Sequence, residues 1–255
     1  MNNNTLVERH FARLGVEAVA TTGSRTSIDV ARSRRREMFV VALPASAEVK
    51  MLDTDRRDRH LLLLVDNNGT KSKFLCGHDE RHWFVAAIPE RARGVTNVRE
   101  AKLALQPPSV RMSTASLRPK DRMRRRNRAF IRQGEWYFVP EPALNPPRAA
   151  VLRHEALSRG RGSAPHWMEF AFRTGGTQVY VSRQYPNGLT QLEFDALPEK
   201  ARKDNWRAMH RDALVYAMGR ITHRDHATVT LPFWHRVLMN TEHQAVAMRH
   251  VAFLD

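Results

Sequence analysis

The apolar stretches of this 255-residue chain are short, and turn-forming residues separate them. The longest, Leu61–Val65 and Trp83–Ile88, are strand-sized and far shorter than the roughly 20 residues that cross a bilayer. Asp66-Asn67-Asn68-Gly69 lies between two apolar runs, where Asn-Gly is a strong hairpin signal. The pattern predicts an α+β, mainly β globular protein with no membrane span.

The expected helices and strands follow from these apolar runs and from the turn-forming residues between them. In the first half, we expect strands at 38–43, 48–52, 59–65, 71–76 and 82–88, and helices at 4–14 and 98–105. In the second half, we expect strands at 135–139, 166–172, 178–182, 216–221, 227–231 and 234–239, and a helix within 190–211. Short strands with frequent Gly and Pro predict a sandwich or a partly open barrel for the second half.

Positive charge is concentrated in one segment. The chain has 42 Lys and Arg against 26 Asp and Glu, a net charge of +16. Nine basic residues and one acidic residue, net +8, fall within residues 109–133. This segment follows Pro107-Pro108 and is expected to connect two small β-rich domains, 1–108 and 134–255.

Arginine-rich, strongly basic segments are typical of nucleic-acid binding, because the guanidinium group contacts phosphate in a bidentate way. The sequence therefore predicts a nucleic-acid-binding protein, with RNA favoured over DNA. Other proteins of a nucleoprotein complex are further possible partners, and no membrane is expected. A solvated linker and a basic scaffold subunit of a ribonucleoprotein are the alternatives. The expected phosphate contacts are Arg118, Lys120, Arg122, Arg124, Arg125, Arg126, Arg128 and Arg132.

Aromatic residues interleaved with arginine are candidates for stacking on bases. Tyr137, Tyr185, Arg183 and Arg236 are the residues chosen on this ground. Packing in the core is the competing interpretation. Strand alternation places Trp136 and Phe138 on one face and Tyr137 on the other, so at least one set is expected to be buried.

Eight of the 12 histidines fall in the second half, most densely within 222–244. His223, His226 and His235 are the alternative metal-binding or catalytic residues, with His154 and His166 upstream; they would serve a hydrolase or nuclease. His223 and His226 share a face only if they form a turn. His226-Ala227-Thr228-Val229 also matches the signature of the 2H phosphoesterases, whose required second copy is missing. We assign no catalytic residue, metal or cofactor from sequence.

The single cysteine, Cys76, excludes an internal disulfide, and the cytoplasm is the expected compartment. Cys76 lies in FLCGHDERHW beside several ionisable residues. A nucleophile or a metal ligand is one interpretation. The favoured one is a charged β-turn between two strands, with Cys76 as a small buried residue.

The segment IRQGEWYFVPEP resembles the opening strand of a group of small uncharacterised bacterial and phage proteins that begin with an RQGD/E motif. His223, His226, Leu231 and Pro232 match the later His-x-x-His turn and Leu-Pro of that group. The intervening Gly-His-x-His of the group is not kept, and His166 is its only remnant. The resemblance covers 132–237. It implies a compact β fold and no established activity.

Overall fold

The computed structural model describes residues 3–33, 36–158 and 164–245, which form two compact units. Unit 1 contains the described residues up to Arg124 together with 240–245. Unit 2 contains the described residues from Arg125 to Met239. The expected connector 109–133 is therefore divided between the units, and the end of the expected C-terminal domain folds with unit 1.

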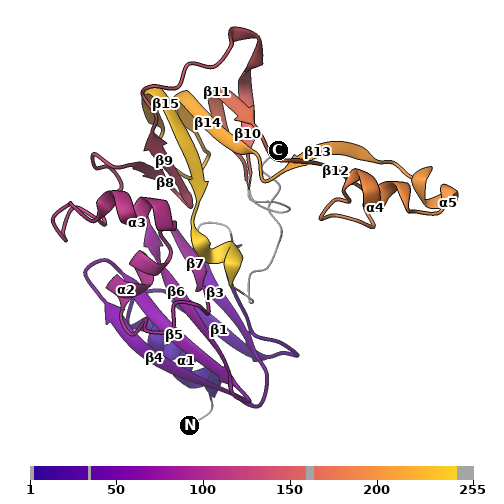
Figure 1. Cartoon of the computed structure of the whole chain (residues 1–255). Helices are drawn as coiled ribbons and strands as arrows, with labels where there is room; N and C mark the ends of the chain where they lie inside the picture. The colour runs from indigo at the N-terminus through magenta and orange to yellow at the C-terminus, as the bar shows by residue number, and fades with distance from the viewer. Residues whose placement is uncertain (1–2, 34–35, 159–163, 246–255) are drawn as a thin grey trace. The chain divides into compact units, whose positions relative to one another are not determined.

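Unit 1 has two sheets (Figure 1). The first has the order β1-β3-β2, with β1 parallel and β2 antiparallel to β3, and the second is an antiparallel meander of β4 to β7. Helix α1 (Asn3–Ala12) contacts β1 and β4. The strands are β1 (Glu17–Thr22), β2 (Ser27–Ser33), β3 (Arg36–Leu43), β4 (Ala47–Asp55), β5 (His60–Asn67), β6 (Thr70–Asp79) and β7 (His82–Ile88).

The apolar run in β5 is continuous because both faces of this strand are covered. Leu61 and Leu63 lie in the core that also contains Phe11 and Phe39, whose rings stack at 4.3 Å. Leu62 points to a second core, which α2 (Val98–Ala104) completes. Strand alternation thus divides one leucine-rich run between two cores.

Residues 240–245 complete the C-terminal end of α2. The Thr241 hydroxyl donates to the Ala104 carbonyl at 2.7 Å, and its backbone N–H donates to the Leu105 carbonyl at 3.0 Å. These carbonyls lie at the C-terminal end of the helix, where carbonyl groups have no hydrogen-bond donor within the helix itself. A short 3-10 helix, η2 (Thr241–Gln244), thus folds with unit 1, although sequence placed it in the second domain.

Helix α2 ends before Pro107-Pro108, as the sequence predicted, but the sequence did not predict that a further helix follows. Helix α3 (Pro108–Thr114) begins directly there. Proline is favoured at the first position of a helix, because that residue's N–H has no helical partner in any case.

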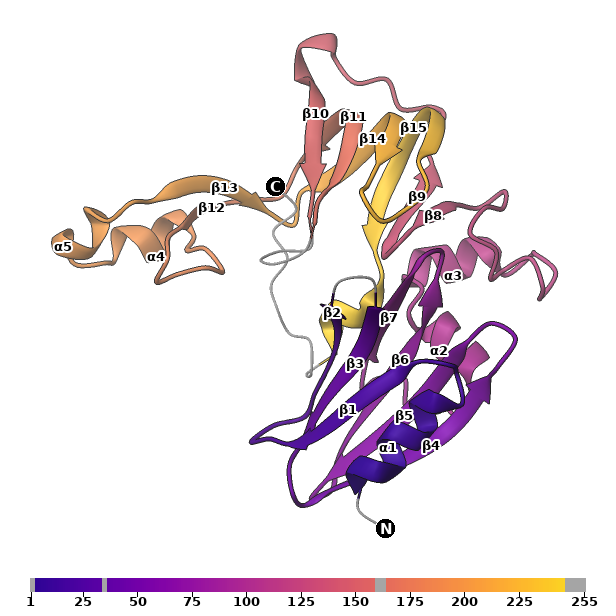
Figure 2. The same cartoon turned by 180° about the vertical axis from the view of Figure 1, so that it is seen from behind.

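Unit 2 is built on an open antiparallel sheet of order β10-β11-β14-β15-β9-β8, which is not closed into a barrel (Figure 2). Its core contains Trp136, Phe138, Leu157, Met168 and Ile221, all fully buried. The strands are β8 (Ile131–Gln133), β9 (Trp136–Pro140), β10 (Val151–Leu157), β11 (His166–Thr174), β14 (Leu214–Thr222) and β15 (Val229–Met239), and a 3-10 turn, η1 (Arg148–Ala150), precedes β10.

A separate hairpin of β12 (Thr177–Val181) and β13 (Arg207–Arg211) extends from this sheet with two short helices (Figures 1 and 2). The helix expected within 190–211 is instead α4 (Gln191–Asp195), α5 (Glu199–Arg202) and β13. Pro198 separates the helices, because proline lacks the N–H that would continue α4. The last part of the expected helix, 207–211, is a strand because it pairs with β12.

The α+β, mainly β fold class predicted from sequence is confirmed. Strands β1, β2, β8 and β10 were not predicted, and the two strands expected at 227–231 and 234–239 are one, β15. Within the parts of the chain that the structure describes, no helix is both long and apolar enough to cross a membrane.

Candidate nucleic-acid interface and histidine cluster

The basic segment is ordered by local hydrogen bonds. Asp121 accepts from the side chain of Arg118 at 2.9 Å and pairs with Arg124 at 3.3 Å. The Arg122 guanidinium donates to the carbonyls of Leu117 and Ala115 at 2.8 and 2.7 Å. Arg122 therefore stabilises the local backbone, and this use accounts for two of its donors.

Residues 125–132 form a tight hairpin in unit 2. The Arg132 N–H donates to the Arg125 carbonyl, and the backbones of Arg126 and Ile131 form an isolated antiparallel β-bridge. At the tip, the Asn127 side chain accepts from the backbone of Ala129 at 2.8 Å and of Phe130 at 3.1 Å. This use of Asn to order a turn fixes where the neighbouring arginines emerge.

The structure separates the predicted phosphate contacts by exposure. Arg122, Arg125 and Arg132 are half-buried, and Arg132 donates to the Gly134 carbonyl at 3.2 Å. The exposed members are Arg118, Lys120, Arg124, Arg126 and Arg128. The exposed fractions of the Arg118 and Arg124 side chains are 74% and 63%, despite their ion pairs with Asp121.

Tyr137 has to be removed from the predicted base-stacking residues. It is 5% exposed and its ring packs against Phe130, at a centroid distance of 5.0 Å, on the face opposite Trp136 and Phe138. Both faces of β9 are therefore covered, where sequence alternation predicted that at least one of them is buried. Tyr185 is half-buried against Trp206, Arg183 is exposed and Arg236 is half-buried.

Two exposed aromatic residues were missed by sequence reasoning. Trp167 is 38% exposed and stacks on His154 at 4.5 Å, and Phe233 is 37% exposed and stacks on His235 at 4.7 Å. Strand alternation around the buried Met168 is the signal that places Trp167 on the outer face of β11.

Three histidines of unit 2 form a cluster: His166, His223 and His226, called here the three-histidine cluster. One possible ligand atom from each lies within 4.8 Å of the others. The ring centroids of His166 and His223 are 4.2 Å apart, and those of His223 and His226 are 4.7 Å apart. His166 is 1% exposed, and the other two are half-buried.

The cluster forms because 223–226 is a turn, the one condition under which sequence placed His223 and His226 together. The Gln133 amide donates to the Ile221 carbonyl at 3.2 Å and to the Ala227 carbonyl at 2.6 Å. These carbonyls lie on either side of the turn. A buried amide from the Arg-Gln-Gly motif thus holds both ends of the segment that carries two of the histidines.

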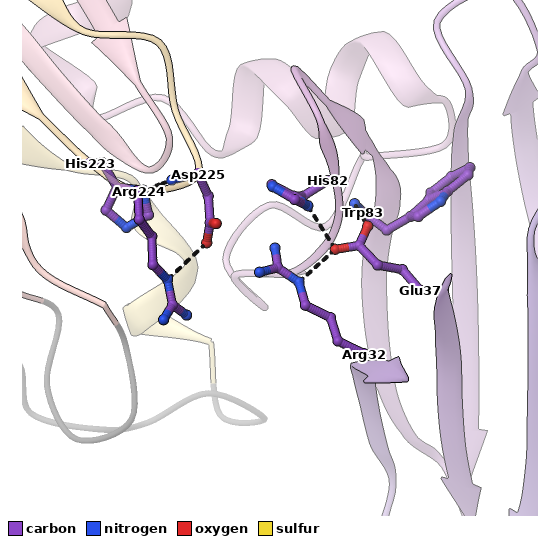
Figure 3. A network of polar contacts seen from close by, with 7 residues as sticks. All are labelled: Arg32, Glu37, His82, Trp83, His223, Arg224 and Asp225. Carbon is purple, nitrogen blue, oxygen red and sulfur yellow. Dashed lines mark hydrogen bonds and ion pairs between the residues drawn. The ribbon is translucent and has the colours of Figure 1, made fainter. Parts of the chain in front are cut away.

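His223 has a defined hydrogen-bonding pattern. Its Nδ1 accepts from the Asp225 N–H at 3.1 Å (Figure 3). Its Nε2 lies 3.3 Å from the Ala164 carbonyl. A carbonyl can only accept, so this pattern assigns the proton to Nε2. Burial lowers the pKa of His223, and His226 nearby lowers it further, so the neutral ring is favoured.

The structure brings together two members of the predicted set of His223, His226 and His235. His235 contacts the Phe233 carbonyl through Nδ1 at 2.7 Å and is not part of the cluster, whose third member is His166 at the start of β11. Burial lowers the pKa of His235, with a smaller contribution from Arg126. Sequence had identified His166 only as an upstream residue and as part of the resemblance.

Cys76 lies in the core of unit 1 and is fully buried. Burial raises the pKa of its thiol, because the thiolate is not solvated there. The thiol therefore stays protonated and out of contact with solvent, which agrees with the favoured interpretation of Cys76 as a small buried residue. It does not meet the requirements of a nucleophile.

Comparisons with known protein families, with curated proteins and with solved structures found no match. The resemblance to RQGD/E-type proteins stays a prediction.

Proposed function

We propose that the protein binds nucleic acid, RNA ahead of DNA, through the basic residues of 118–128. The observation that carries the proposal is the exposure of Arg118, Lys120, Arg124, Arg126 and Arg128 in a segment with a single carboxylate, Asp121. Such charges bind phosphates and release counterions. Local hydrogen bonds order residues 118–124 within unit 1 and residues 125–128 within unit 2, which lowers the entropy lost when each part binds.

The test compares two variants that each lose three positive charges. Lys120, Arg126 and Arg128 are changed to Gln in one, and Lys200, Arg202 and Lys203, exposed in and beside α5, are changed in the control. We expect the first to bind single-stranded RNA more weakly, with a log–log salt slope shallower by about 0.7 per lost phosphate contact. Equal affinities and slopes for the two variants would reject the proposal. Duplex and single-stranded DNA measured in parallel test the preference for RNA.

A second candidate function is hydrolysis of a phosphodiester at the three-histidine cluster, now with His166 in place of His235. It is favoured because the basic hairpin 125–132 is followed directly by Gln133, whose amide holds both ends of the turn that carries His223 and His226, and by Gly134, whose backbone lies beside His226. Incubation of labelled single-stranded RNA with wild type and with His226→Gln tests it. We expect cleavage by wild type alone; an intact substrate in both reactions would reject hydrolysis of this substrate.

A further inference from the structure

The three-histidine cluster brings together three side chains from separate parts of the chain. His166 begins β11, and His223 and His226 lie in the turn between β14 and β15. The angles between the ring planes are 20° for His166–His223 and His166–His226 and 30° for His223–His226, so the rings are stacked. Histidine is the most common metal-binding side chain, and it binds as the neutral imidazole.

The backbone approaches two rings of the cluster closely at Gly134. Gly134 has a positive φ of 57°, and a Cβ atom on it would lie 2.8 Å from Nε2 of His226 and 3.4 Å from Nε2 of His166. Two imidazole nitrogens thus face the same space, which any larger residue at 134 would fill. The positive φ and the close approach both require glycine here.

The turn that carries His223 and His226 is already held in place. Gln133 fixes the carbonyls of Ile221 and Ala227. The contact of His223 Nε2 with the Ala164 carbonyl is the arrangement in which a metal-binding histidine donates its second ring N–H to the backbone. Nδ1 of His223, which accepts from the Asp225 N–H at 3.1 Å, is then the atom that would bind the ion in place of that N–H.

We propose that His166, His223 and His226 form a site for one divalent transition-metal ion of the zinc type. In tetrahedral zinc sites with Zn–N bonds of about 2.0–2.1 Å, ligand nitrogens are about 3.3 Å apart. The three ligand atoms, all within 4.8 Å of one another, need to approach by about 1.5 Å or less. Because the lone pairs lie in the planes of these stacked rings, the half-buried rings of His223 and His226 also have to rotate out of the stack on binding, with release of the Asp225 N–H.

An all-nitrogen site selects its ion. Imidazole suits zinc, copper, nickel and iron, whereas magnesium and calcium prefer oxygen ligands. Three protein ligands also leave a coordination position for water or another ligand, as in catalytic zinc sites. The site goes beyond the proposed nucleic-acid binding and does not depend on it.

The test is a titration of untagged, chelator-stripped protein with Co²⁺, followed by displacement with Zn²⁺. We expect about one ion per chain, with visible absorption bands of low-coordinate Co²⁺ that Zn²⁺ removes. His223→Gln and His226→Gln should each weaken binding at least tenfold. The control, His210→Gln, changes an exposed histidine of the same unit and should bind as wild type does. Equal binding by His226→Gln and wild type would overturn the proposal.

A second measurement does not rely on any variant folding correctly. Wild-type protein is treated with diethyl pyrocarbonate, with and without Zn²⁺, and the modified histidines are located by mass spectrometry. We expect Zn²⁺ to protect His223 and His226 but not His210. Equal modification of His223 and His226 with and without Zn²⁺ would also overturn the proposal.

Discussion

The histidines of the two units have different surroundings. In unit 1, His82 contacts the Glu37 carboxylate at 2.8 Å, and the buried ring of His60 lies edge-on to Phe84 (Figure 3 shows the Glu37 contacts). In unit 2, three imidazoles pack against one another. A carboxylate stabilises a charged histidine, whereas neighbouring histidines disfavour charge on one another. Unit 1 thus places its histidines singly beside a carboxylate or an apolar ring, whereas unit 2 gathers three imidazoles in one place.

The largest expected effect concerns His60. Its pKa is lowered to about 4, mainly by burial and also by Lys102, from an ordinary value of 6.5. The unfolded chain therefore binds a proton first as the pH falls. Unit 1 should lose about 3 kcal/mol of stability between pH 6.5 and 4, because each unit of pKa difference corresponds to about 1.4 kcal/mol. Hydrogen exchange of β5 peptides, corrected for intrinsic rates, measures the loss.

His60→Leu removes the titrating ring and should reduce the acid-dependent loss by that amount. Carboxylates also titrate in this pH range, so the informative quantity is the difference in acid-dependent loss of stability between the variant and wild type. The same pH dependence in both proteins would show that burial does not lower the pKa of His60.

The next prediction tests whether the cluster needs the space beside Gly134. Gly134→Ala should weaken Zn²⁺ binding about 10- to 100-fold, because its Cβ would lie 2.8 Å from Nε2 of His226. Gly175→Ala is the matched control: its φ is also positive, 68°, but nothing lies within 4 Å of its Cβ. Calorimetric titration measures both. Equal Zn²⁺ affinities would argue against the Gly134 space as part of the site.

The smallest expected effect concerns Glu37. Burial alone would raise its pKa, but hydrogen bonds from the Trp83 backbone, Arg32 and His82 outweigh burial and lower it (Figure 3). Glu37→Gln should destabilise unit 1 by about 1–2 kcal/mol, because it removes the charge from hydrogen bonds that join β2, β3 and β7.

Glu48→Gln, at an exposed position of β4, is the control and should be neutral. Hydrogen exchange of β3 and β7 peptides compares the two variants. Similar protection in both would mean that the carboxylate–histidine contact contributes little to unit 1.

Much of the fold could be predicted from local patterns. The Asn-Gly hairpin between β5 and β6 has its expected place, with Asn68 and Gly69 at positive φ. Strands β1 and β10 were not predicted because half-exposed strands lack a continuous apolar run. Helix α3 was missed because Pro107-Pro108 can end one helix and begin another, and the residues that pack against it decide which.

The sequence by itself determined the mainly β class, the concentration of basic residues in 109–133 and the abundance of histidine in the second half. Only the tertiary structure decided that His166, rather than His235, joins His223 and His226, and that Tyr137 is buried. The reason is physical: charge and periodicity are local properties of the chain. Which side chains meet depends on strand order and register, and β11 and β14 bring distant segments together through long-range pairing.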